Sequence, residues 1–181
     1  AFDEAFERYA VPLVRKGVTS LFSELKPLYA SEGKGARVGA TFAAWLANLE
    51  STGTFRAPGP DGPAPGSGDG GRACEAPCTV LWVRFLLAQH LDMVGDHAAA
   101  VAEVDRAIAH TPTVVELYVF KARVFKHAGD LEEAARLSEL ARNLDLADRY
   151  LNTKSTRYLL RAGRAEEAAG VISLFTKDGP D

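Results

Sequence analysis

The stretch VELYVFKARVFKHAGDLEEAARL, residues 115–137, decides the fold, because it holds two apolar helical patterns separated by a single glycine, Gly129. Gly95 lies 34 residues before that glycine and Gly163 lies 34 residues after it. Each of these glycines also separates two patterns with the 3.6-residue period of an amphipathic helix. A fixed interval of this kind predicts a repeated helix–turn–helix unit, which buries its apolar face only by stacking on its neighbours.

Equivalent positions in the three units agree where helix packing requires small side chains. With the glycine at the fifteenth place, the units begin at Leu81, Val115 and Arg149 and cover about residues 81–114, 115–148 and 149–177. The small residues at the expected points of closest helix approach are Ala88, Ala122, Thr156, Ala100, Ala134 and Ala168. This pattern is that of the tetratricopeptide repeat, so the sequence predicts an all-α, right-handed solenoid of stacked helix–turn–helix pairs.

Aspartates and acidic pairs mark where the second helices of the units begin. Asp96 and Asp130 follow two of the glycines and are predicted to cap the next helix. Asp130 with Glu133, and Thr113 with Glu116, have the spacing of a capping box. The pairs 132–133 and 166–167 are glutamates in the same place of two units, where negative charge complements the helix dipole, and we interpret them as structural.

The segment before the repeats has a different organisation. Residues 1–52 form a helical region, with helices predicted over 2–14, 19–29 and 37–49, and residues 53–78 form a Gly/Pro-rich segment that we predict to be a mobile loop. The three repeats then fill residues 79–177. Because the chain lacks an initiator Met and its last unit lacks a polar capping helix, we expect it to be a piece of a longer solenoid.

Composition excludes several classes of function. The chain has 181 residues with a net charge of −3, which gives no argument for nucleic acid or an anionic membrane as the main partner. No run reaches the roughly 18 apolar residues of a membrane span, and no signal peptide is visible. Cys74 and Cys78 are too few for a disulfide scaffold and lack the histidine partners of a zinc site. We therefore expect a reduced, cytoplasmic protein.

Motifs for catalysis or nucleotide binding are weak. Residues 33–39, GKGARVG, are glycine-rich, but no predicted strand precedes them, as a phosphate-binding loop requires. The four histidines, at positions 90, 97, 110 and 127, are not spaced as metal ligands with acidic or cysteine companions. The sequence therefore predicts no catalytic residue and no metal site.

One group of cations is a candidate binding surface. In tetratricopeptide units the first helix lines the concave wall, and its inward places hold Arg123 and Lys126 in the second unit and Arg157 in the third. Lys154, Arg157 and Tyr158 share a helix face with Arg161 by their spacing. Ammonium and guanidinium groups are suited to phosphate or carboxylate ligands. A solvated basic face without a ligand remains the alternative.

Four segments carry a resemblance to a known family. They are VPLVRKGVTSLFSELKPLY (11–29), TVLWVRFLLAQHLDMVGD (79–96), AIAHTPTVVELYVFKARVFKHAGDLEEAARL (107–137) and LDLADRYLNTKSTRYLLRAG (144–163). Within them, KHAGDLEEAA and LADRYLNTK match the family at surface positions too, where the packing of the repeat does not require a particular residue. The chain resembles the auxiliary subunits of the N-terminal acetyltransferase A complex (NatA).

The resemblance implies a noncatalytic, cytoplasmic scaffold. It implies a helical solenoid that wraps a separate catalytic subunit, adapts it to N-termini exposed after methionine removal, and helps place it at the ribosome. It implies no cofactor of the chain's own, no membrane partner and no direct sequence-specific binding of nucleic acid. In that family an inositol hexakisphosphate lies between the auxiliary and the catalytic subunit. The resemblance carries this ligand over to Lys126 in KHAG and to Lys154, Arg157 and Tyr158 in NTKSTRY, and the repeat geometry adds Arg123.

Two other functions stay in competition. A generic tetratricopeptide adaptor or cochaperone captures C-terminal carboxylates with a clamp of Lys, Asn and Arg. The corresponding places here hold Phe85, Gln89, Phe120, Tyr150 and Lys154, of which only the last is basic. An acetyltransferase in its own right requires a pyrophosphate loop after a strand, and residues 37–40, RVGA, lack its spacing.

Overall fold

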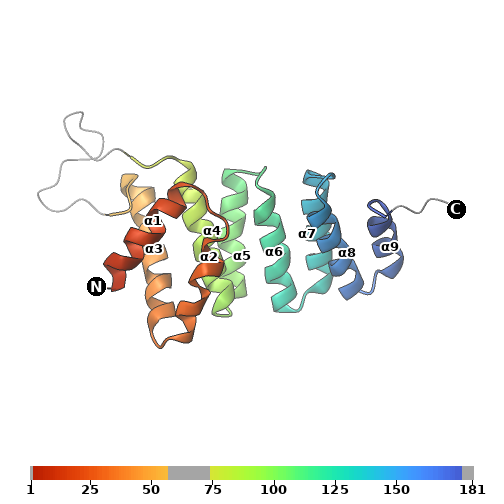
Figure 1. Cartoon of the computed structure of the whole chain (residues 1–181), viewed down its shortest axis with the longest axis horizontal. Coiled ribbons are helices and arrows are strands. Elements are labelled where there is room, and N and C mark those ends of the chain that lie inside the picture. Colours follow the sequence, from red (N-terminus) through yellow and green to blue (C-terminus); the bar gives the residue numbers. More distant parts are fainter. Residues whose placement is uncertain (1, 57–73, 177–181) are drawn as a thin grey trace, which may run out of the picture. The chain divides into compact units, whose positions relative to one another are not determined.

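The computed structural model describes residues 2–56 and 74–176, and all regular elements in these ranges are helices (Figure 1). The chain divides into two compact units, residues 1–107 and 108–181. The helices of the first unit are α1 (Phe2–Arg15), α2 (Leu21–Leu25), the 3-10 helix η1 (Lys26–Ala30), α3 (Lys34–Thr52), α4 (Cys78–Met93) and α5 (His97–His110), whose last turn passes the boundary. Those of the second are α6 (Val115–Ala128), α7 (Leu131–Leu144), α8 (Arg149–Arg161) and α9 (Ala165–Ser173). The predicted all-α fold class is confirmed.

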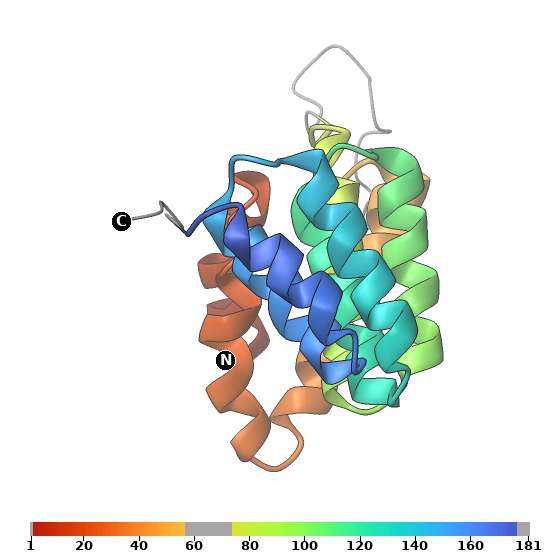
Figure 2. The same ribbon diagram turned by 90° about the vertical axis from the view of Figure 1, so that its right-hand side faces the viewer.

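The second unit consists of two successive helix–turn–helix pairs. Each of its helices packs on the next, from α6 to α9, and Figure 2 views this unit from its α9 end. The first helices of the two pairs begin at Val115 and Arg149, the places at which the repeat register starts its units. Gly129 and Gly163 follow these helices with φ of 92° and 76°, the left-handed conformation that ends a helix and that side chains disfavour. The glycine positions were therefore correctly predicted.

Small residues line the contacts between the paired helices. Ala122 and Ala134 are fully buried and Ala168 is nearly so, and all three belong to one apolar cluster of the second unit. Ala88 and Ala100 are fully buried in the first unit. A larger side chain at such a site forces the helices apart, so the recurrence of alanine sets the spacing of each pair.

The two predicted capping boxes have different outcomes. Asp130 accepts a hydrogen bond from the backbone N–H of Glu133 at 2.9 Å, as a cap does. The carboxylate of Glu133 does not return to Asp130 but binds the Arg136 guanidinium through two bonds of 2.6 Å. The N–H of Asp130 instead donates to the carbonyl of Phe125 at 3.0 Å, so this box is half formed.

The prediction of a capping box at Thr113 is wrong. The N-cap position of α6 is Val114, and it has no side-chain cap, because the helix begins one residue later than that box requires. The predicted cap at Asp96 is confirmed, since its carboxylate accepts from the N–H of Ala99 at 3.1 Å. A cap that the sequence analysis missed is Asp148 on α8, which accepts from the N–H of Tyr150 at 2.7 Å.

An aromatic cluster forms the core of the first unit. Trp45 of α3 packs with its ring centroid 5.8 Å from Phe6 of α1 and 5.2 Å from Phe55. The α3 residues Phe42, Leu46 and Leu49 are buried with Trp45 on the predicted face of that helix. Phe55 is 7% exposed, so the ordered core extends past residue 52, where the sequence analysis ended the helical region. Residues 57–73 of the predicted loop lie outside the described ranges.

The glycine-rich segment 33–39 serves packing. Its last residue, Gly39, lies in α3 against His90 of α4, where an added Cβ would come within 2.1 Å of the imidazole Nε2. The other ring nitrogen, Nδ1, is 2.8 Å from the hydroxyl of Tyr29. Burial lowers the pKa of His90 and raises that of Tyr29, so this hydrogen bond joins two neutral groups at pH 7. A side chain at position 39 has no room without displacing the pair.

We therefore predict that Gly39→Ala destabilises the first unit by about 1–3 kcal/mol, because the methyl group overlaps the His90 ring. The matched control is Gly170→Ala in α9, where a Cβ meets no atom within 4 Å, and which is expected to stabilise by about 0.5–1 kcal/mol through helix propensity. Urea denaturation followed by circular dichroism measures both. Equal effects of the two substitutions would contradict the packing role of Gly39.

Candidate anion-binding surface

The five predicted site residues lie on two helices of the second unit. Arg123 and Lys126 are three residues apart on α6, and Lys154, Arg157 and Tyr158 lie on α8. Residues three or four apart share one side of a helix. α7 packs against both α6 and α8, so the distance between the two groups of cations depends on α7.

Arg123 is held by an aromatic contact. Its guanidinium carbon lies 4.8 Å from the ring centroid of Phe120, one turn earlier on α6, which is the geometry of a cation–π contact. Its Nε atom is buried and has no hydrogen-bond partner among the described residues. A buried donor left without a partner costs free energy, which an arriving acceptor can recover.

Lys154 and Arg157 of α8 differ in exposure and in their contacts: Lys154 is half-buried and Arg157 is exposed. The ammonium of Lys154 lies 5.5 Å from the ring of Tyr150, and that ring is itself exposed. Arg157 is exposed, and its guanidinium forms no hydrogen bond or ion pair within the described residues. The five N–H donors of such a group match phosphate and carboxylate oxygens in pairs. Arg157 is therefore the group on α8 most available to an anion.

Tyr158 differs from its neighbours. Its side chain is only 4% exposed and belongs to the apolar cluster that includes Leu159 and Ala122. The guanidinium carbon of Arg161 lies 5.9 Å from its ring. The ring therefore serves packing, and any contact with an anion is left to its hydroxyl.

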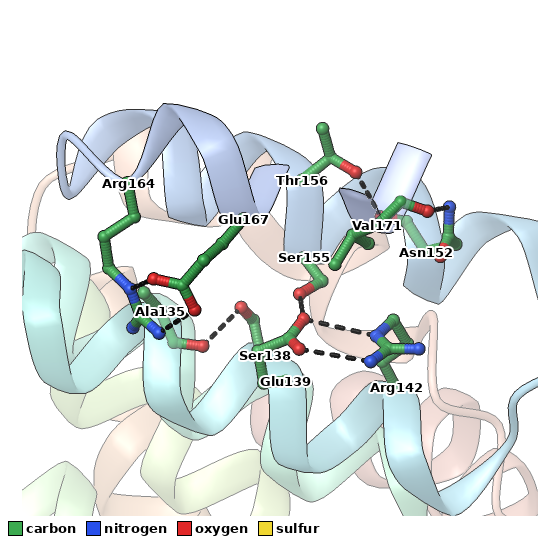
Figure 3. Close-up of polar contacts among 10 residues, drawn as sticks. All are labelled: Ala135, Ser138, Glu139, Arg142, Asn152, Ser155, Thr156, Arg164, Glu167 and Val171. Atoms are coloured by element: carbon green, nitrogen blue, oxygen red, sulfur yellow. Dashed lines mark hydrogen bonds and ion pairs between the residues drawn. The ribbon is translucent and has the colours of Figure 1, made fainter. Parts of the chain in front are cut away.

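The buried face of α8 holds polar contacts that the sequence analysis missed. Figure 3 shows Ser155 donating to the carboxylate of Glu139 on α7, and Asn152 donating to the backbone of α9. The signal in the sequence is NTKST at residues 152–156, where polar residues occupy the inward positions of a repeat helix. Of this stretch, only Thr156 was predicted to lie at a helix contact.

Other kinds of site find no support in the described ranges. Residues 2–56 and 74–176 contain no group of three or more His, Cys, Asp or Glu side chains that could hold a metal ion. Cys74 and Cys78 are exposed free thiols. Within the same ranges no helix has the length and apolar character to cross a membrane.

Comparison with known proteins places the chain in a family. A profile described as "N-terminal acetyltransferase A, auxiliary subunit" matches residues 1–181. The chain is 42% identical over 178 residues to the "N-terminal acetyltransferase A complex auxiliary subunit NAA15" of Arabidopsis thaliana, covering 98% of this chain and 18% of that protein. It is 36% identical over 178 residues to the "N-alpha-acetyltransferase 16, NatA auxiliary subunit" of Homo sapiens, covering 98% of this chain and 19% of that one.

A solved structure has the same fold. The match is to a chain of the "Structure of Naa15/Naa10 bound to HypK-THB", with a TM-score of 0.77 and 31% identity over 96% of this chain and 23% of that chain. The fold and the 34-residue register define a helical-repeat protein of the tetratricopeptide class. The chain belongs to the family of NatA auxiliary subunits and spans less than a fifth of the length of these curated relatives.

The burial of Tyr158 yields a prediction that separates its ring from its hydroxyl. Tyr158→Ala is expected to cost the second unit about 3–5 kcal/mol, because it removes a buried ring. Tyr158→Phe keeps the ring and is expected to cost about 1.5 kcal/mol or less. Chemical denaturation measures both variants. If Tyr158→Ala were as stable as Tyr158→Phe, the ring would not be part of the core.

Proposed function

We propose that residues 1–181 are part of a noncatalytic auxiliary subunit that holds and modulates the catalytic subunit of a protein N-terminal acetyltransferase. The observation that carries this proposal is the agreement of the family profile, over residues 1–181, with a structural match to Naa15 in a complex with Naa10. Repeat proteins of this class expose long helical surfaces, which suit a scaffold that binds another protein. Cytoplasmic location and association with the ribosome stay predictions.

The proposed interface includes a bridging polyanion. Inositol hexakisphosphate, or a ligand with the same phosphate chemistry, would be held by Lys126 and Arg123 of α6 and by Lys154 and Arg157 of α8, with the Tyr158 hydroxyl as a further candidate. The unpaired guanidinium of Arg157 and the unmet Nε donor of Arg123 support this. Several cations gathered around one polyanion neutralise charge that neither subunit could bury alone.

The cochaperone alternative fits the structure less well. Of the places that a carboxylate clamp requires, Phe85 and Gln89 are buried in the first unit. The side-chain amide of Gln89 donates to the carbonyl of Phe85 at 3.2 Å, within its own helix. These two side chains are not available to a peptide C-terminus. The scaffold of an acetyltransferase is therefore the better supported function.

A charge-reversal experiment tests the proposal. The intact protein that contains this chain is co-expressed with its catalytic partner, as wild type and as Lys126→Glu with Arg157→Glu, and complex recovery and peptide acetylation are measured. We expect the reversal to weaken the complex at least tenfold, because each charge-assisted hydrogen bond contributes about 1.5–3 kcal/mol. The control Lys16→Glu with Lys26→Glu makes the same change in net charge in the first unit, at exposed positions, and is expected to leave the complex intact.

The outcomes separate the two parts of the proposal. An active wild-type complex that is insensitive to the reversal at Lys126 and Arg157 would keep the scaffold and discard the anion site. Equal weakening by the control would show that net charge, and not this surface, matters. If wild-type protein neither binds nor alters the catalytic subunit, the scaffold function itself is wrong.

A further inference from the structure

α8 packs on its neighbours through polar side chains. Asn152, Ser155 and Thr156 are all buried, and they occupy the side of α8 that faces the interior of the second unit. The hydroxyl of Thr156 bonds back to the carbonyl of Asn152 at 2.9 Å, within α8, while the other two side chains reach neighbouring helices. Apolar packing is non-directional, but hydrogen bonds have narrow preferred geometries. α8 is therefore fixed in rotation as well as in distance.

The contact with α7 is made by a buried hydroxyl and a carboxylate. Ser155 is fully buried, and its Oγ donates to Oε1 of Glu139. The same carboxylate is held from the other side by Arg142, whose Nε and Nη2 each lie 3.2 Å from its oxygens (Figure 3). Both charged side chains are partly buried, with 14% of the Arg142 side chain and 26% of the Glu139 side chain exposed. The carboxylate thus has a fixed position, and Ser155 binds to it.

The contact with α9 is made one turn earlier on the same face. The Asn152 side-chain amide donates to the carbonyl of Val171 at 2.9 Å, in a buried position. The side-chain oxygen of Asn152 is buried and has no hydrogen-bond partner among the described residues. The orientation of this side chain therefore favours the bond from its amide nitrogen to Val171. Ser155 and Asn152 together tie α8 to the helices on both sides.

The cations of α8 are adjacent to these ties in sequence. Lys154 precedes Ser155 by one residue and Arg157 follows it by two; Lys154 is half-buried and Arg157 is exposed, whereas Ser155 is buried. A helix with its side chains has a radius of about 5–6 Å, and a rotation of about 20° therefore moves a surface group by about 2 Å. Such a shift exceeds what a hydrogen bond tolerates. The arrangement of cations from α6 and α8 thus depends on the rotation of α8.

We propose that Ser155, through Glu139, is a positioning residue of the anion-binding surface, which sets the Lys154 and Arg157 side chains of α8 against the Arg123 and Lys126 side chains of α6. This inference rests on the anion site of the proposed function, and it identifies the buried contact that positions the cations of that site. Ser155 itself touches no ligand. Its effect is on the geometry of four cations.

The chain supplies a matched control. Ser138 is also a buried serine of the interface around α7, but its hydroxyl donates to the carbonyl of Ala135 at 2.8 Å, within the same helix. Ser155→Ala and Ser138→Ala thus remove the same atom from a similarly buried site. Only Ser155→Ala removes a bond between helices.

The experiment measures binding of inositol hexakisphosphate by isothermal titration calorimetry. It uses the intact auxiliary subunit in complex with its catalytic partner, stripped of bound anion, at a temperature well below the melting point of every variant. Ser155→Ala is expected to weaken binding at least fivefold, and Ser138→Ala less than twofold. Equal effects of the two substitutions would overturn the positioning role and leave the anion site standing.

A double-mutant cycle separates positioning from a general loss of structure. In a background that already carries Arg157→Gln, Ser155→Ala is expected to cost less than half of its effect in the wild type, because one of the groups that it positions is absent. Additive losses would overturn the proposal. Failure of the wild-type complex to bind the anion would overturn the site of the proposed function and this inference with it.

Discussion

The close approach of paired helices at alanine is the constraint on which the rest of the structure depends. Ala122 of α6, Ala134 of α7 and Ala168 of α9 are buried in one apolar cluster, and their small side chains allow the helices of the second unit to approach closely. This spacing fixes which residues of each helix face outward. The cations of α6 and α8 lie at half-buried or exposed positions, while the alanines of α6, α7 and α9 occupy the buried side.

α8 adds directionality to this packing. Its inward side chains include Asn152 and Ser155, which form hydrogen bonds to α9 and α7, where a repeat helix more often has hydrocarbon. Burying polar groups costs free energy unless they are hydrogen-bonded, and the bonds that do form here favour one geometry of α8 on its neighbours. A surface that must present several cations to one ligand benefits from that specificity. α8 thus forms hydrogen bonds to its neighbours on its buried face and carries cations on its other side.

Periodicity predicted the fold well, and it predicted single contacts less well. The left-handed glycines, such as Gly129, and the buried alanines follow from the 34-residue register alone. Phe55 was assigned to a loop because its surroundings are rich in Gly and Pro, yet it packs on Trp45. The Ser155–Glu139 bond could not be predicted, since it joins residues 16 apart whose pairing depends on the crossing of two helices.

The most direct test of the account is an electron cryo-microscopy map of the intact auxiliary subunit with its catalytic partner in the presence of inositol hexakisphosphate. The account predicts density for one polyanion between the subunits, within hydrogen-bond distance of cations from both α6 and α8, with the Ser155 hydroxyl on the Glu139 carboxylate. A map in which the anion lies away from these two helices, or in which α8 is rotated so that Arg157 points elsewhere, would contradict it.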